Sequence, residues 1–297
     1  MRISEALSTQ RPFFSFEFFP PKDEAAHAHL LETIEALRPL RPAFVSVTWG
    51  AGGSTRARTL EICKQIRNEI GLDPMAHVTC VGSTRADLRN IFNDLEAAGI
   101  ENIMALRGDP PRGSSTFVPV ENGFHYAAEL IAMLRRVYDF DIGAACYPEK
   151  HPEAPDAQTD LAHLVEKVRA GADFLVSQFF FDNEKYFSFV ERARTAGITV
   201  PILAGLMPIT NYQQIARMSS LGGGLIPPKL LAALEERREE PKAVEDLGVA
   251  YATLQAADLL RRGAPGIHFY TLNKSPATRA IVSALLAATA WRSFITR

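Results

Sequence analysis

The chain has 297 residues, of which 47% are hydrophobic and 22% are charged, and its formal net charge at pH 7 is −2. This balance argues against nucleic acid and against an anionic membrane surface as partners. The first residues lack the apolar core of a signal peptide, and residues 280–291 are too few to span a bilayer, so we expect neither a signal peptide nor a membrane span.

The first predicted strand, residues 13–19, places Glu17 among phenylalanines, and Pro20 and Pro21 end it. Because burial raises the pKa of a carboxyl group, we expect Glu17 to stay protonated near neutral pH and to act as a general acid. The alternative is a glutamate at a strand edge that pairs with a lysine or an arginine. This stretch alone does not decide between the two.

Seven further runs of apolar, β-branched or aromatic residues are predicted strands: 43–49, 75–80, 102–107, 142–147, 174–181, 200–206 and 266–272. Most lack polar–apolar alternation, which is typical of parallel strands covered on both sides. Amphipathic helices are predicted between them at 25–37, 55–70, 88–98, 126–137, 161–170, 185–195 and 212–221. Five glycines stand where a helix C-cap glycine belongs: Gly71, Gly99, Gly171, Gly197 and Gly222.

Eight strand and helix units without a change of composition predict a single (β/α)8 TIM barrel over residues 1–297. An open, doubly wound sheet is the alternative fold, but no G-x-G-x-x-G sequence follows the first strand. Two connections are long. Residues 109–124 are rich in proline, glycine and serine and are expected to cover the barrel mouth, and residues 221–265 are expected to contain more than one helix.

Polar residues collect at the C-terminal ends of the predicted strands, where barrel enzymes have their active sites. Seven of the eight strands bring one there, and the set contains Glu17, Ser46, Thr48, His77, Thr79, Arg107, Asp109, Tyr147, Glu149, His151, Gln178, His268, Tyr270 and Asn273. Each has a structural explanation by itself, for example a core histidine or a turn aspartate. The joint pattern indicates a functional site.

Two kinds of cofactor fit the sequence poorly. The histidines lack the close spacing of a metal-ligand set, and no lysine lies in the strands to form a Schiff base with pyridoxal phosphate. The three cysteines, Cys63, Cys80 and Cys146, have no zinc or C-x-x-C spacing. We therefore expect reduced thiols in a cytoplasmic protein.

Six stretches that run in order from the first strand to the last closely resemble the methylenetetrahydrofolate reductase family in its bacterial, single-domain form: residues 16–22, 45–50, 106–109, 147–152, 178–182 and 268–273. The resemblance implies an FAD-containing barrel that reduces 5,10-methylenetetrahydrofolate to 5-methyltetrahydrofolate by a ping-pong reaction, with NADH or NADPH as electron donor. It also implies a homo-oligomer. A barrel without flavin that binds folate or transfers a methyl group is the alternative.

Carried over by position, the resemblance implies that Glu17 protonates N10 of the folate, which opens the five-membered ring to a 5-iminium cation. Asp109 would stabilise that cation. The implied FAD contacts are Thr48, Trp49, His77, Arg107, Gly108, Asp109, Tyr147, His151, Asp160 and Lys167. The implied substrate contacts are Glu17, Asp109, Gln178, Met218, Tyr270 and Lys274.

Some positions depart from the usual bacterial pattern. Trp49 stands where tyrosine is usual, Met218 where an aromatic residue is expected, and Lys274 where arginine is common. Glu166 stands beside Lys167 where a basic residue is common, although Arg107 and Lys167 are the cations expected near the pyrophosphate of FAD. These departures concern nucleotide preference and affinity, and the reaction class is unaffected.

Overall fold

Eight parallel strands form a closed barrel in chain order, which confirms the predicted fold class. The computed structural model describes residues 1–9, 12–21, 23–49, 56–110, 116–222 and 224–288. The strands are β1 (Phe14–Phe18), β2 (Phe44–Val47), β3 (Pro74–Thr79), β4 (Asn102–Leu106), β5 (Asp141–Cys146), β6 (Phe174–Ser177), β7 (Ile202–Leu206) and β8 (Ile267–Tyr270).

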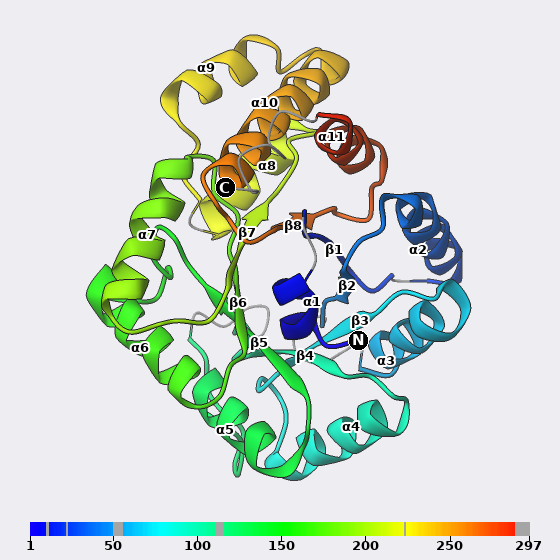
Figure 1. The fold of residues 1–297 in the computed structure, drawn as a ribbon, viewed down its shortest axis with the longest axis vertical. Helices are drawn as coiled ribbons and strands as arrows, with labels where there is room; N and C mark the ends of the chain where they lie inside the picture. Colours follow the sequence, from blue (N-terminus) through cyan, green and yellow to red (C-terminus); the bar gives the residue numbers. More distant parts are fainter. Residues whose placement is uncertain (10–11, 22, 50–55, 111–115, 223, 289–297) are drawn as a thin grey trace.

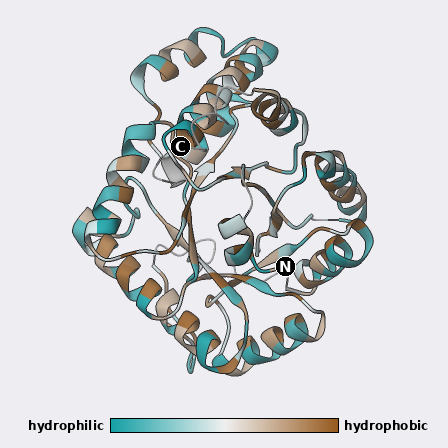
Figure 2. Cartoon of the chain, viewed as in Figure 1, coloured by the Kyte–Doolittle hydropathy of each residue, from teal (hydrophilic) through white to brown (hydrophobic). Residues whose placement is uncertain are grey.

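Helices surround this ring of strands (Figure 1). They are α2 (Glu24–Leu37), η1 (Arg38–Leu40), α3 (Arg56–Gln65), η3 (Ile66–Ile70), α4 (Arg85–Ala97), α5 (Ala127–Val137), α6 (Ala157–Arg169), α7 (Asn183–Thr195), α8 (Tyr212–Gly222), α9 (Pro228–Glu236), α10 (Pro241–Arg261) and α11 (Pro276–Ala287). Figure 2 shows the outer helices with hydrophobic and hydrophilic stripes, as expected for amphipathic helices on a sheet. No helix in the described ranges is both long enough and apolar enough to cross a membrane.

Two separate apolar layers follow from the alternation of side chains along each strand. Outward-facing residues such as Phe16, Val45 and Val78 pack under the helices in the main hydrophobic core. Inward-facing residues such as Phe44 and Met104 fill the N-terminal end of the barrel interior in a second cluster. Most strands therefore carry apolar residues on both faces of the sheet, which explains why the sequence lacks polar–apolar alternation.

The helix α1 (Ile3–Thr9) was not predicted from the sequence, and it closes the N-terminal end of the barrel. Ile3, Ala6 and Leu7 are buried and pack against the inward-facing cluster that contains Phe44 and Met104. Figure 1 shows α1 over the middle of the ring of strands. Seven residues with three apolar positions are too short for a periodicity argument, so only the packing partner reveals this helix.

Other predicted boundaries also changed. The predicted helix 55–70 consists of α3 followed by the π-helical segment η3, and Thr55 lies outside the described residues. The strand expected over 174–181 ends at Ser177. Of the five glycines, Gly222 lies within α8, whereas the other four have positive φ angles at or just beyond helix ends. Residues 111–115 of the connection expected to cover the mouth also lie outside the described residues.

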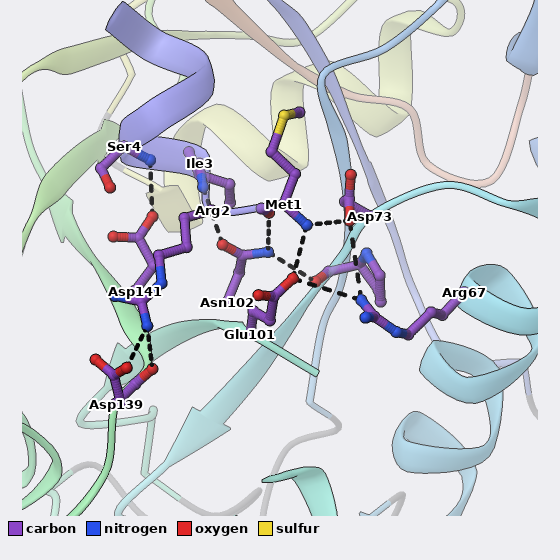
Figure 3. Close-up of polar contacts among 11 residues, drawn as sticks. Met1, Arg2, Ile3, Ser4, Arg67, Asp73, Glu101, Asn102, Asp139 and Asp141 are labelled. Carbon is purple, nitrogen blue, oxygen red and sulfur yellow. Dashed lines mark hydrogen bonds and ion pairs between the residues drawn. The ribbon is translucent and has the colours of Figure 1, made fainter. Parts of the chain in front are cut away.

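A polar network holds α1 in place, as Figure 3 shows. Asn102, which is 1% exposed, accepts a hydrogen bond from the backbone N–H of Ile3 and donates to the carbonyl of Pro74. Asp141 accepts a hydrogen bond from the N–H of Ser4 at 2.7 Å. Burial raises the pKa of Asp141 to about 6, and the nearby carboxylate of Asp173 acts in the same direction.

We predict that Asp141→Asn stabilises the protein above pH 6. In the folded protein the pKa of Asp141 is about 6, above the ordinary value of 3.8, so the wild type loses stability as pH rises between these values. Asparagine can still accept from Ser4, and it removes a buried charge beside Asp173. Urea unfolding should show a gain of about 1–2 kcal/mol above pH 6 that vanishes near pH 4.

Asp139→Asn is the matched control. Asp139 is exposed and pairs with Arg2, which lowers the pKa of its carboxyl group. Its replacement should therefore give no gain above pH 6. A stability difference for Asp141→Asn that is constant across this pH range would contradict the assignment.

Candidate active site at the barrel mouth

Glu17 lies inside the barrel near the C-terminal end of β1, and the residue is 6% exposed. Its Oε2 lies 3.3 Å from Nε2 of His268 and 3.5 Å from Nε2 of His77. The same oxygen accepts a hydrogen bond from Ser46 Oγ at 3.5 Å. On the far side of the His268 ring, Nδ1 lies 2.8 Å from Ser15 Oγ. We call Glu17, His77 and His268 the Glu17 cluster.

Strand register assembles this cluster from distant parts of the chain. Parallel pairing sets Glu17 opposite Ser46 of β2 and opposite Tyr270 of β8. Ser15 stands opposite His268 in the same β1–β8 pair. Because Ser15 and Glu17 are two residues apart, their side chains share the inward face of β1. The sequence analysis noted His268 and Ser46 as strand-end residues but did not identify them as partners of Glu17.

The expectation that burial leaves Glu17 with a raised pKa is wrong. Burial acts to raise the pKa, but the hydrogen bond with His268 and the positive charges of His77 and His268 outweigh it and lower the pKa below its ordinary value. Burial in turn lowers the pKa of His77. The carboxyl group of Glu17 is therefore in direct contact with two imidazoles and does not stand alone among the phenylalanines.

A second polar group gathers on the β4 to β6 side of the mouth. The ring of Tyr147 packs edge-on against the ring of His151, with 4.6 Å between centroids, and Asp160 accepts a hydrogen bond from the backbone N–H of His151 at 3.0 Å. Burial raises the pKa of Tyr147, and the charge of the exposed Asp109 adds to the rise. The structure thus brings together four residues that the sequence analysis assigned to one site.

The two cations expected near a pyrophosphate already have oxygen partners. Arg107 donates two hydrogen bonds of 2.7 Å to the carboxylate of Glu153, and its guanidinium lies 4.9 Å from the ring centre of Phe117. Lys167 donates to the carbonyl of Ala145 at 2.6 Å. Glu153 was not predicted as a partner of Arg107, because its only signal in the sequence is an acidic residue in the same loop as His151. An anion that binds Arg107 must compete with Glu153.

Gly108 allows a close backbone approach beside β3. Its φ angle is +88°, and a Cβ atom at this position would lie 2.8 Å from Val81 Cγ1 and 3.0 Å from Thr79 Cβ. Oγ1 of Thr79 is buried without a hydrogen-bond partner among the described residues, whereas Nε2 of His77 lies 3.5 Å from Glu17 Oε2. Buried polar atoms are normally paired, so the Thr79 hydroxyl is an exception at this end of the barrel.

Thr48 and Trp49 differ in where their side chains lie. Thr48 is 8% exposed and continues the inward face of Ser46, and its carbonyl accepts a hydrogen bond from Thr59 Oγ1. The side chain of Trp49 instead belongs to the main hydrophobic core between sheet and helices, together with Val47. Trp49 can therefore contact a ligand at the mouth only through its backbone, because its indole packs between the sheet and the helices.

Three of the predicted substrate contacts line the β6 to β8 side. The hydroxyl of Tyr270 donates to the carbonyl of Ser177 at 2.8 Å, and its ring stands edge-on to Phe179. Met218 of α8 and Tyr270 both pack against an apolar cluster that contains Phe179. Gln178 accepts a hydrogen bond from the N–H of Phe179. Lys274, which the sequence analysis added to this group, is exposed beyond the end of β8.

Two residues after β8 hold the end of β1: Asn273, which was predicted at a strand end, and Thr271, which was not. Thr271 Oγ1 donates to the backbone carbonyl of Glu17 at 2.6 Å. The amide of Asn273 accepts from the N–H of Phe19 and donates to its carbonyl. Leu272 and Asn273 both have left-handed φ angles, 52° and 57°. Both residues belong to the stretch 268–273 that resembles the family. Their contacts with the end of β1 form only when β8 pairs with β1 in the closed barrel.

Comparison with known proteins identifies the family of this chain. A family model described as methylenetetrahydrofolate reductase matches residues 2–286. The chain belongs to the methylenetetrahydrofolate reductase family. The 5,10-methylenetetrahydrofolate reductase of Escherichia coli (strain K12) is 40% identical over 271 residues, which cover 91% of this chain and 90% of that protein.

Other members of the methylenetetrahydrofolate reductase family are longer. Methylenetetrahydrofolate reductase (NADH) 1 of Arabidopsis thaliana is 40% identical over 283 residues, which cover 92% of this chain and 48% of that protein. The chain thus spans about half the length of this plant relative. Among solved structures, one similar fold is that of a Clostridium thermocellum protein that binds 5-methyl-5,6,7,8-tetrahydrofolic acid. The alignment covers 95% of this chain and 97% of that protein, with a TM-score of 0.62 and 16% sequence identity. This likeness concerns the fold.

We predict that Gly108→Ala destabilises the protein more than Gly197→Ala. The two glycines have nearly equal φ angles, +88° and +87°, but a Cβ atom at position 197 would meet nothing within 4 Å. Gly197→Ala should cost about 1 kcal/mol through the left-handed backbone alone. Gly108→Ala should cost about 1–3 kcal/mol more because Val81 and Thr79 must move. Chemical denaturation of both variants measures the difference, and equal losses would show that position 108 is not crowded.

Proposed function

We propose that the protein is an FAD-dependent methylenetetrahydrofolate reductase that converts 5,10-methylenetetrahydrofolate to 5-methyltetrahydrofolate. NADH or NADPH is the electron donor in this ping-pong scheme, which can also run in the oxidative direction. The observation that carries the proposal is the buried Glu17 cluster at the mouth of a barrel of this family. A cytoplasmic homo-oligomer, with folate and a nicotinamide nucleotide as its small-molecule partners, belongs to the same proposal.

The residues at the mouth fit FAD. The buried imidazole of His77 and the backbone of Gly108 supply polar groups that suit the edge of a flat ring system. Aromatic rings such as Tyr147 suit stacking against it. We expect the flavin nucleotide to contact Thr48, Trp49, His77, Arg107, Gly108, Asp109, Tyr147, His151, Asp160 and Lys167. FAD, when bound, would carry hydride from the nicotinamide nucleotide to the folate.

In this proposal Glu17 transfers a proton to N10 of the folate. The reduction requires an open ring with a cationic 5-iminium group, and ring opening requires a proton at N10. The Glu17 cluster supports this role because His268 and His77 both lie within 3.5 Å of Glu17 Oε2, close enough to pass a proton to it. A carboxyl group coupled to imidazole can release a proton to a substrate and regain one afterwards.

Asp109 supplies negative charge at the opposite part of the mouth. It is exposed and adjoins Arg107 and Tyr147. The pKa of Arg107 is raised chiefly by Glu153 and that of Tyr147 chiefly by burial, and the charge of Asp109 adds to both. A carboxylate that a bound ligand shields from water stabilises a cation more strongly than one in bulk solvent. Gln178, Met218, Tyr270 and Lys274 are the further proposed substrate contacts.

We predict that Glu17→Gln separates the two half-reactions. Flavin reduction by the nicotinamide nucleotide needs no general acid, whereas folate reduction needs the proton at N10. The variant should bind FAD, be reduced at a rate within about threefold of wild type, and lose folate reduction by at least about 100-fold. Stopped-flow absorbance of the flavin, with NADH or NADPH and then with methylenetetrahydrofolate, measures each step.

Glu69→Gln is the matched control, because Glu69 is an exposed residue of η3. It should leave both half-reactions unchanged. Retained folate reduction in Glu17→Gln would exclude Glu17 as the acid. Wild-type protein that stays colourless and binds no FAD would instead support the barrel without flavin that binds folate or transfers a methyl group.

We predict that Asp109→Asn slows folate reduction by about 100- to 1,000-fold, since a well-placed electrostatic contact to a developing charge contributes on this scale. The amide keeps the shape of the side chain and removes the charge that faces the cation. Flavin reduction should change less, and the stopped-flow measurement on each half-reaction compares the two. Near-normal folate reduction in this variant would rule out the proposed role.

A further inference from the structure

Thr79 is the last residue of β3, and its hydroxyl is buried without a partner. The residue is 6% exposed, and Oγ1 has no hydrogen bond to any described residue. Other buried hydroxyls of the barrel do have partners. Ser15 lies within hydrogen-bond distance of His268, and Ser177 accepts a hydrogen bond from the N–H of Gly205. The unpaired state of Thr79 is therefore unusual within this barrel.

The neighbours of Thr79 place its hydroxyl at the candidate active site. Thr79 and His77 are two residues apart on β3, so both side chains share the inward face of the strand. Nε2 of His77 lies 3.5 Å from Glu17 Oε2, so the Thr79 hydroxyl stands next to the Glu17 cluster along β3. Just beyond the end of the adjoining strand β4, Gly108 lies so close that an added Cβ atom would be 3.0 Å from Thr79 Cβ. The unpartnered Thr79 hydroxyl thus lies on the same strand face as His77 and close to the backbone of Gly108.

An unpaired buried hydroxyl has a cost in the free protein. Moving a hydroxyl from water to an apolar site without a new hydrogen bond destabilises the folded state. Valine has the same shape as threonine and avoids this cost. The hydroxyl at position 79 therefore makes sense only if it gains a partner when a ligand binds, which is the usual exchange of stability for function at a binding site.

We propose that the Thr79 hydroxyl hydrogen-bonds the polar edge of the bound flavin and is a cofactor-binding residue of this protein alongside His77. The inference rests on the proposed function, because the ligand is the FAD of that proposal. A threonine hydroxyl can donate and accept, so it suits a heterocycle edge that carries carbonyl and N–H groups. This contact goes beyond the positions that the family resemblance implies.

The experiment compares Thr79→Val with Thr79→Ser. For each variant, the melting temperature is measured on FAD-depleted protein, and the FAD dissociation constant is measured from flavin fluorescence. Thr79→Val should raise the melting temperature of the depleted protein by about 2 °C and weaken FAD binding about tenfold, as expected for one lost hydrogen bond. Thr79→Ser retains the hydroxyl and should bind FAD within about threefold of wild type.

Thr33→Val is the matched control, since Thr33 is also buried but donates a hydrogen bond to the carbonyl of His29 at 2.9 Å. This variant should melt at a lower temperature and bind FAD normally. If Thr79→Val binds FAD with unchanged affinity, the inference about Thr79 is overturned. The proposed function is not affected by that result, provided that the wild type binds FAD. Loss of affinity in Thr79→Ser equal to that in Thr79→Val would also overturn the inference, because the hydroxyl would not be the cause. Wild-type protein without FAD binding would overturn both.

Discussion

A carboxylate inside the barrel must be surrounded by groups that compensate for its lost hydration, and the arrangement at the mouth follows from this requirement. Glu17 cannot stand alone among the phenylalanines of β1, so β8 supplies His268, β3 supplies His77 and β2 supplies Ser46. Four strands thus contribute side chains to the surroundings of the single carboxylate of Glu17. The cost of burying Glu17 is offset only when the barrel is closed in the correct register, which ties the chemistry of the site to the fold.

The two ends of the barrel treat polar groups in opposite ways. At the N-terminal end, α1 covers the interior and Asn102 and Asp141 hydrogen-bond to its first residues. At the mouth, Thr79 retains a buried hydroxyl without a partner among the described residues. The first arrangement contributes to stability, and the second sacrifices some stability in favour of binding. This asymmetry is typical of the division of labour in barrels, where sites form at the C-terminal ends of the strands.

Charge pairing at the mouth has a consequence for anion binding. Arg107 is held by both oxygens of Glu153 and lies over Phe117, so its guanidinium is oriented before any ligand arrives. The same pairing raises the pKa of Arg107 and lowers that of Glu153. A phosphate group must therefore displace or share a carboxylate at this position. Sequence comparison that considers Arg107 alone overestimates the positive charge available there.

The sequence was sufficient for the fold class because that information is local. Apolar strand segments, amphipathic helices and glycines at helix ends all follow from the geometry of short stretches, and eight repeats of the pattern specify a barrel. It also located Glu17 on the first strand and the polar residues at the strand ends. The short helix α1 escaped detection because its three buried residues acquire meaning only against the barrel interior.

The site itself depended on contacts between residues far apart in the chain. Its position at the strand ends followed from the sequence, but the pKa of Glu17 was predicted in the wrong direction because its partner His268 is 251 residues away. Likewise, nothing in the sequence paired Arg107 with Glu153, placed the Trp49 indole outside the barrel interior or left the Thr79 hydroxyl without a partner. Sequence patterns determined which residues reach the mouth of this protein. Strand register and barrel closure decided which of them touch, and electrostatic interactions depend on those distances.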